Sequence, residues 1–262
     1  MGHQSSLNSD QLFKSRLEPI LYQVVDICHQ NMANLFISSL HPRPAFAQTA
    51  VKVLHLRPAV SPEQAAEILW LCHGLQELTL QIVANLPADE NPLYEPLHPL
   101  PLHTLYLDLA SVFYGPNIFL PELPLLRHVN RLHLTNGWVA RWGLYIGLQE
   151  LSQLTHLSFH ICPPGQQTTH PEILFEILRH FLGLQVVVLW WMEYHESEEI
   201  YSNLVQNGLT DHWIIVFNSV YFLGYARSFW EVAEHIVQWR KDNRGIFFDY
   251  FCTAWSHIPY FQ

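Results

Sequence analysis

The stretch HVNRLHLTNG, residues 128–137, has the alternation of a β-strand whose two faces differ in chemistry. Leu132 and Leu134 are apolar, whereas the residues before them, Arg131 and His133, are polar. Neighbouring side chains of an extended strand point to opposite faces. The stretch therefore predicts a strand whose leucines enter a core, with Arg131 and His133 exposed on the other face.

Similar stretches recur along the chain, and the last core residues of consecutive stretches are 24 to 30 residues apart. The pattern L-x-x-L-x-L at a period of roughly 20 to 29 residues is typical of leucine-rich repeats. We therefore predict an α/β fold, an irregular leucine-rich-repeat solenoid of about eight parallel strands with helical or extended returns and a C-terminal capping helix. The stretches end at Ile27, Leu56, Leu80, Leu107, Leu134, Phe159, Leu189 and Phe217.

The segments between the strands differ in character. Residues 61–74 (SPEQAAEILWLCHG) predict a helix, with Ser61 as its cap and Pro62 at its first position. Residues 170–183 (HPEILFEILRHFLG) repeat this design. Residues 84–101 carry five prolines and predict an extended connector.

The pattern divides the chain into four parts: a disordered N-terminus (1–14), one continuous solenoid (15–225), a capping helix (226–244) and an aromatic tail (245–262). Near the end of the solenoid, apolar residues take the outward positions that are polar in the middle repeats. An exposed apolar strip of this length normally has a cover, so we expect the helix to cap the last repeat and the tail to fold over the strip. The strip consists of Val186, Val188, Trp190, Ile214 and Val216.

Equivalent residues of adjacent repeats form rows across such an array. The rows predict a partner-binding surface, and Ser158 beside His133 is the one pair they place as a nucleophile and base. His156 and His160 are about 13 Å apart along a strand, too far to share one metal ion. We therefore predict no catalytic, cofactor-binding or metal residues. The predicted partner-binding residues are Tyr106, Asp108, Arg131, His133, His156, Ser158 and His160.

Composition narrows the function classes. The formal net charge of −10 and the absence of a basic stripe disfavour nucleic acid as a partner. The four scattered cysteines and the lack of an N-terminal apolar run favour a cytoplasmic or nuclear protein. The longest apolar stretches are too short for stable membrane insertion. MGHQSS fits a myristoylation pattern at Gly2.

Four motifs together resemble F-box-derived leucine-rich-repeat proteins of mushroom-forming fungi: SRLEPILYQVV from Ser15, VKVLHL with EQAAEILWLCHGLQELTL, VNRLHLTNGW, and DHWIIVF leading to RSFWEVAEHIVQWRK. The resemblance covers residues 15–241 and implies the substrate-binding half of a ubiquitin-ligase receptor. Fewer than 20 residues precede the EPILY stretch, so we expect the ligase-docking F-box to be missing. A Skp-type adaptor is expected as a partner only if an F-box exists upstream.

These patterns lead to two hypotheses about function. The first is a non-enzymatic protein-recognition scaffold whose target is an unknown protein. The alternative is an enzyme, a metal- or His-assisted hydrolase that uses the region of Asp108, His133 and His156.

Overall fold

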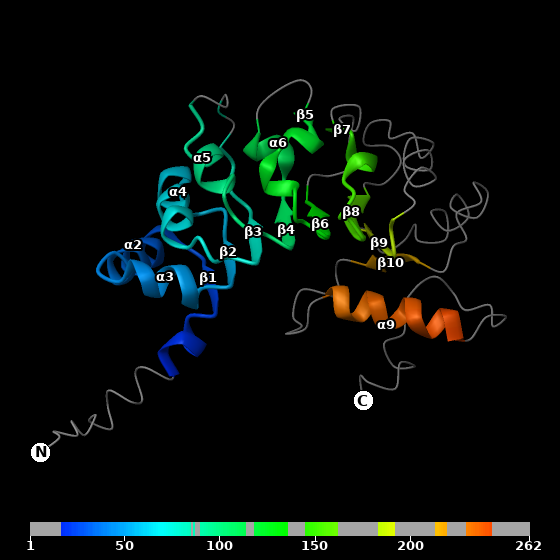
Figure 1. Ribbon diagram of the computed structural model, residues 1–262, viewed down its shortest axis with the longest axis horizontal. Coiled ribbons are helices and arrows are strands. Elements are labelled where there is room, and N and C mark those ends of the chain that lie inside the picture. Colours follow the sequence, from blue (N-terminus) through cyan, green and yellow to red (C-terminus); the bar gives the residue numbers. More distant parts are fainter. Residues whose placement is uncertain are drawn as a thin grey trace, which may run out of the picture. The chain divides into compact units, whose positions relative to one another are not determined.

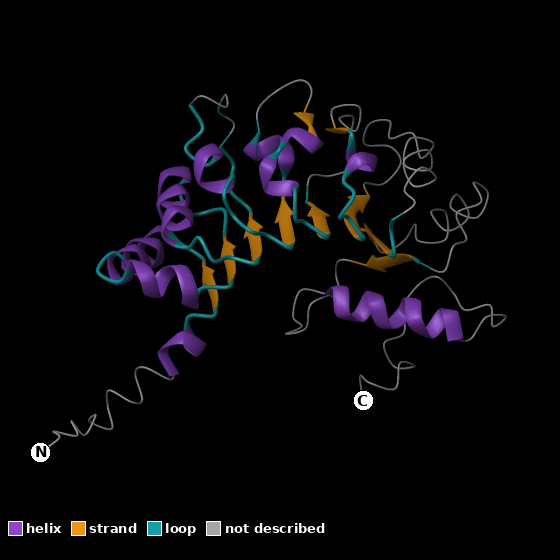
Figure 2. Cartoon of the chain, in the orientation of Figure 1, coloured by secondary structure: helices purple, strands orange, loops and turns teal. Residues whose placement is uncertain are grey.

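The structure is a computed structural model that describes residues 17–84, 86, 90–113, 118–135, 145–161, 183–191, 213–218 and 229–242, and all structural statements below refer to these. The chain divides into two compact units, unit 1 (residues 1–115) and unit 2 (residues 116–262). Each unit combines helices with parallel strands, as Figure 2 shows. The fold is therefore α/β, as predicted.

Unit 1 contains four parallel strands in chain order: β1 (Val24–Ile27), β2 (Val53–Leu56), β3 (Glu77–Leu80) and β4 (Thr104–Leu107). Their bounds agree with the first four predicted stretches. The pairing also confirms the expectation that equivalent residues of adjacent repeats form rows, because Asp26, His55, Thr79 and Tyr106 lie opposite one another. The alternate residues of each strand, such as Leu54, Leu78 and Leu105, are buried.

Helices form the returns of unit 1 (Figure 1): α2 (Gln30–Leu40), α3 (Pro44–Ala50), α4 (Pro62–Leu71), α5 (Tyr94–Leu97) and α6 (Leu109–Val112). The predicted start of α4 is confirmed in detail. Ser61 Oγ accepts a hydrogen bond from the Gln64 amide at 3.3 Å, and Gln64 Oε1 accepts one from the Ser61 amide at 3.2 Å. This reciprocal pair is a capping box, which satisfies two backbone donors at the helix start.

The connector after β3 differs from its prediction, because it contains the single turn α5. Leu93 and Leu97 are buried, and the Asn91 carboxamide oxygen accepts a hydrogen bond from the Leu93 amide at 3.0 Å. Burial of the two leucines and this local hydrogen bond stabilise the helical turn, whereas the prolines of the connector predict an extended chain. The predicted helix at 170–183 lies outside the described residues, apart from Gly183.

Unit 2 also has four parallel strands at predicted positions: β6 (Arg131–Leu134), β8 (His156–Ile161), β9 (Val186–Trp191) and β10 (Ile214–Asn218). A separate parallel pair, β5 (Ile118–Phe119) with β7 (Tyr145–Ile146), was not predicted. Short 3₁₀ helices follow β5 and β7: η1 (Leu120–Glu122), η2 (Pro124–Leu126) and η4 (Leu148–Glu150).

Gly147, between β7 and η4, has a φ of +84°. A Cβ at this position would lie 2.7 Å from Pro121 Cδ. Both the left-handed backbone and the close approach of η1 therefore favour glycine here.

The register of β10 corrects the sequence prediction by one residue. Ile215 lies opposite Val188 and Phe217 lies opposite Trp190, whereas the sequence predicts that Ile214 and Val216 share the outward face with Val188. Since side chains alternate, Ile215 and Phe217 share the face of Val188 and Trp190. The rings of Trp190 and Phe217 are 5.4 Å apart, a contact that favours the observed register.

Helix α9 (Phe229–Asp242) confirms that a helix forms within 226–244, and it contacts β9 and β10 (Figure 1). Its buried residues are Trp230, Val232, Ala233, Ile236 and Val237. The helix contacts the last repeat, where the prediction places it, and it also reaches further, because Glu234 pairs with Arg131 on β6. The helix therefore lies across the strands of unit 2. The predicted disordered N-terminus and aromatic tail lie outside the described residues.

Candidate functional site

The two units present different surfaces on the strand face away from the core leucines. We call the first the polar face of unit 1, made of Asp26, His55, Arg57, Thr79, Gln81 and Tyr106. We call the second the α9 face of unit 2, made of Arg131, His133, His156, Ser158, His160, Val188, Trp190, Ile215 and Phe217.

An ion pair anchors the polar face of unit 1. Arg57 donates to both carboxylate oxygens of Asp26, at 2.9 and 2.8 Å, and its Nη1 donates to Gln81 Oε1 at 3.4 Å. The hydrogen bond from Arg57, opposed in part by burial, lowers the pKa of Asp26 below its ordinary value. Both side chains are about 40% exposed. The pair is thus prearranged and accessible to a partner.

The next row of the same face is linked by a second side-chain bond. His55 Nδ1 and Thr79 Oγ1 are 2.8 Å apart, and burial lowers the pKa of His55 despite the nearby Asp26 carboxylate. Tyr106 follows Thr79 in the row and is half-buried. Hydrogen bonds therefore connect three of the four strands across this face.

The predicted site residue Asp108 has a different role in the structure. Its Oδ1 accepts from the Ser111 amide at 3.1 Å, and its Oδ2 accepts from the Ser111 hydroxyl at 2.8 Å. These bonds are typical of a helix N-cap, and Ser111 lies in the short helix α6. The Asp108 carboxylate therefore stabilises the start of α6.

The α9 face contains the remaining predicted site residues, and for His133, His156 and Ser158 the prediction of exposure was wrong, whereas Arg131 and His160 are partly exposed. His133 and His156 are each 7% exposed, and Ser158 is fully buried. Phe229 of α9 lies against His133, with ring centroids 5.5 Å apart, and Trp230 lies against His156 at the same distance. Strand alternation gave the correct face, but it carried no information about the helix that covers it.

Ser158 and His133 do come together, as the row geometry predicted. Ser158 Oγ lies 2.9 Å from His133 Nδ1 and accepts a hydrogen bond from Trp190 Nε1 at 2.8 Å. Burial, with a smaller effect of His160, lowers the pKa of His133 to about 3. A ring with so low a pKa is a weak base near neutral pH. The Ser–His pair therefore fits a structural hydrogen bond better than a catalytic one.

His156 and Arg131 contact the same carboxylate on α9. Arg131 donates to Glu234, and His156 Nε2 is 3.0 Å from Glu234 Oε1. Thr155 Oγ1 donates to the Asn130 carbonyl at 3.1 Å and also lies 2.8 Å from His156 Nδ1.

Burial is the main cause that lowers the pKa of His156, and Glu234 opposes it. The contact between His156 and Glu234 is therefore an ion pair only when the ring takes up a second proton. His160, whose pKa is also lowered by burial, stacks on Trp190 with ring centroids 6.1 Å apart.

Sequence reasoning missed one cavity in unit 1. A shallow pocket of about 670 Å³ lies beside the N-terminal ends of α2 and α4 and is lined by His29, Ser61, Ile82 and Val83, among others. Both helix ends are already capped, α2 by His29 Nδ1 and α4 by Ser61. Only a structure could reveal this pocket, because its lining comes from three separate loops.

Within the described ranges, no three His, Cys, Asp or Glu side chains are placed to hold a metal ion. In the same part of the chain, none of the helices has the length and apolar character needed to cross a membrane. Comparison with models of known families, with curated proteins and with solved structures finds no match for this chain.

Proposed function

We propose that the chain is a non-enzymatic protein-recognition scaffold of the leucine-rich-repeat type, similar to the substrate-binding half of an F-box ubiquitin-ligase receptor. The observation that carries the proposal is the polar face of unit 1. Its side chains lie in register on four parallel strands, are mostly half-buried, and are linked by hydrogen bonds. A surface whose side chains are already held in place loses little entropy when a partner binds.

The chemistry of this face suits a polar protein segment. Asp26 and Tyr106 lie on one row of this face, and Arg57 and Gln81 lie just beyond it, so the face offers donors, acceptors and an aromatic ring. Arginine and tyrosine are enriched among the residues that dominate binding energy at protein interfaces. We therefore infer that Arg57 and Tyr106 are the main contacts for the target.

The alternative of a metal- or His-assisted hydrolase has less support. Its nucleophile and base, Ser158 and His133, are buried beneath α9 in the same unit. A substrate would reach them only after α9 had moved away. The structure offers no specific observation in favour of that reaction.

The test is capture of partners from host extract on the immobilised chain, followed by mass spectrometry, with wild-type chain beside an Arg57→Ala plus Tyr106→Ala variant. We expect a specific partner whose affinity falls at least tenfold in the variant, since hot-spot residues contribute about 2 kcal/mol or more each. The Asp26–Arg57 pair is exposed enough that its loss costs less than about 1 kcal/mol of stability. The variant should therefore stay folded.

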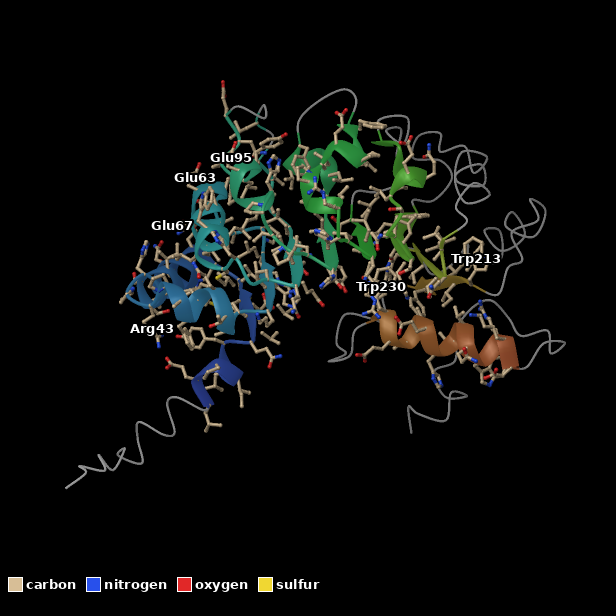
Figure 3. All side chains as sticks on the ribbon, viewed as in Figure 1. Arg43, Glu63, Glu67, Glu95, Trp213 and Trp230 are labelled. Carbon is tan, nitrogen blue, oxygen red and sulfur yellow. The ribbon has the colours of Figure 1, made fainter. Side chains whose placement is uncertain are left out.

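Glu95→Gln, an exposed change on α5 (Figure 3), is the matched control and should leave the affinity unchanged. A partner that binds the double variant as tightly as the wild type would contradict the assignment of this face. Recovery of a Skp-type adaptor and a cullin with the chain would add ligase recruitment to the proposal.

A further inference from the structure

Helix α9 occupies the α9 face of unit 2 as a peptide ligand occupies a groove. Its first two residues, Phe229 and Trp230, are aromatic and meet the rings of Trp190 and His156, with centroids 5.0 and 5.5 Å apart. Figure 3 shows Trp230 on the side of the helix that faces the strands. An amphipathic helix whose apolar stripe fills a groove is a common mode of peptide recognition.

Charged contacts fix the register of the helix at both ends. One turn after Trp230, Glu234 pairs with Arg131 and faces His156. Near the other end, Arg240 Nη1 donates to the Ile214 carbonyl of β10 at 2.6 Å. The face therefore selects a helix with a carboxylate one turn after its aromatic pair and a cation further on.

The surface beneath α9 has the chemistry of an interface more than that of a permanent core. The opposite side of the same strands is lined by Leu132, Leu134, Leu157 and similar residues. Under α9, an arginine, three histidines and a serine lie beside the apolar Val188, Trp190, Ile215 and Phe217, and His160 Nδ1 finds no hydrogen-bond partner among the described residues. Buried polar groups cost free energy unless they are paired, and arginine and aromatic residues are enriched at interfaces.

We propose that the α9 face is a second recognition site, and that α9 is an intramolecular occupant which gives way to an amphipathic helix of a partner protein. The partner helix carries two adjacent aromatic residues and a carboxylate one turn later, the chemistry that Arg131 and the rings of the face select. This site goes beyond the proposed function, which rests on the polar face of unit 1.

The length of chain between β10 and α9, which we call the tether, determines how strongly α9 competes with a partner helix. Ten residues separate Asn218 at the end of β10 from Phe229 at the start of α9. Short tethers give effective concentrations in the millimolar range, so an external helix binds wild-type chain weakly. A change that weakens α9 in its own chain must therefore strengthen the binding of an external copy.

The experiment uses the full chain and a fluorescent peptide with the sequence of residues 229–242, followed by anisotropy. We expect Trp230→Ala chain to bind the peptide at least tenfold more tightly than wild-type chain, and Trp230→Ala plus Arg131→Ala chain to lose that gain. Glu234→Gln in the chain, a milder change at a partly exposed residue, should raise peptide affinity several-fold. The exposed Glu231→Gln is its matched control and should change nothing.

Hydrogen exchange of wild-type chain gives a second readout that needs no variant. If α9 detaches while the strands stay paired, its amides exchange at least tenfold faster than those of β9. Equal protection of α9 and β9, with no peptide binding to Glu234→Gln chain, would overturn the proposal. A dimer of Trp230→Ala or Glu234→Gln chain that the peptide cannot dissociate would also overturn it, because the preferred occupant would then be a second copy of this chain.

Discussion

His133 shows most clearly how the environment of one residue departs from its sequence context. The pattern around it gave the correct strand and the correct face, and it gave the hydrogen bond to Ser158. It did not give the burial, because Phe229, which lies against the ring, is far away in the sequence. Local alternation predicts the direction of a side chain, whereas burial depends on whatever the rest of the chain places there.

The low pKa of His133 makes the stability of unit 2 depend on pH. In the folded chain the ring stays neutral down to about pH 3, whereas the unfolded chain takes up a proton near the ordinary value of 6.5. Below pH 6.5 the unfolded state binds more protons, so stability falls as the pH falls. His133 alone should remove about 2 kcal/mol between pH 7 and pH 5. Denaturant unfolding followed by tryptophan fluorescence measures this loss.

His133→Asn keeps a hydrogen-bond partner for Ser158 but cannot titrate in this range. The loss of stability between pH 7 and pH 5 should therefore become smaller in this variant. His128→Asn, at an exposed position, is the control and should retain the wild-type slope. The groups that face His133 include His160, Ser158, Trp190 and Phe229, and His160 is the one imidazole among these four, with a pKa that burial lowers as well. An unchanged slope in His133→Asn would refute the assignment.

At the scale of elements, the strands were more predictable than the returns. All eight main strands lie where the repeats placed them, since each has an alternating core pattern or an apolar run. Strand β10 is the exception, because its register differs from the prediction by one residue. Its residues Ile214, Ile215, Val216 and Phe217 are all buried. A strand that is apolar on both faces gives no sign of which residue belongs on which face. The short helices α5 and α6 were missed because one turn is too short to show a helical period.

The capping box of α4 gives a prediction for a single element. Ser61→Ala removes the acceptor for the Gln64 amide and should lower the free energy of unfolding by about 1 kcal/mol. Ser61→Asp retains an acceptor at the same position and should be nearly neutral. Equilibrium unfolding followed by circular dichroism measures both. Equal losses for the two variants would show that the hydroxyl contributes by packing and not by capping.

At the scale of the whole molecule, the sequence predicts one continuous solenoid, whereas the structure divides into two compact units. Unfolding distinguishes these views, because Trp70 is the single tryptophan of residues 1–115 and the others all follow residue 116. Fluorescence therefore reports mainly on unit 2. Circular dichroism reports strongly on the helices α2 to α4 of unit 1.

A continuous solenoid should unfold with the same denaturant midpoint by both probes, because neighbouring repeats stabilise one another. We expect this coincidence. Two separated midpoints would show that the units fold independently and that the prediction of one solenoid was wrong.

The contact between Arg131 and Glu234 also has a consequence for synthesis of the chain, because 103 residues separate the two. At roughly 5 to 20 residues per second, a ribosome needs on the order of 5 to 20 s to make that interval. During this time the histidines and rings of the strands are made one strand after another, and the helix that covers them is made last. In a nascent chain arrested before residue 229, the α9 face therefore stays uncovered. Chaperones, and other nascent chains on the same messenger RNA, can then bind to it.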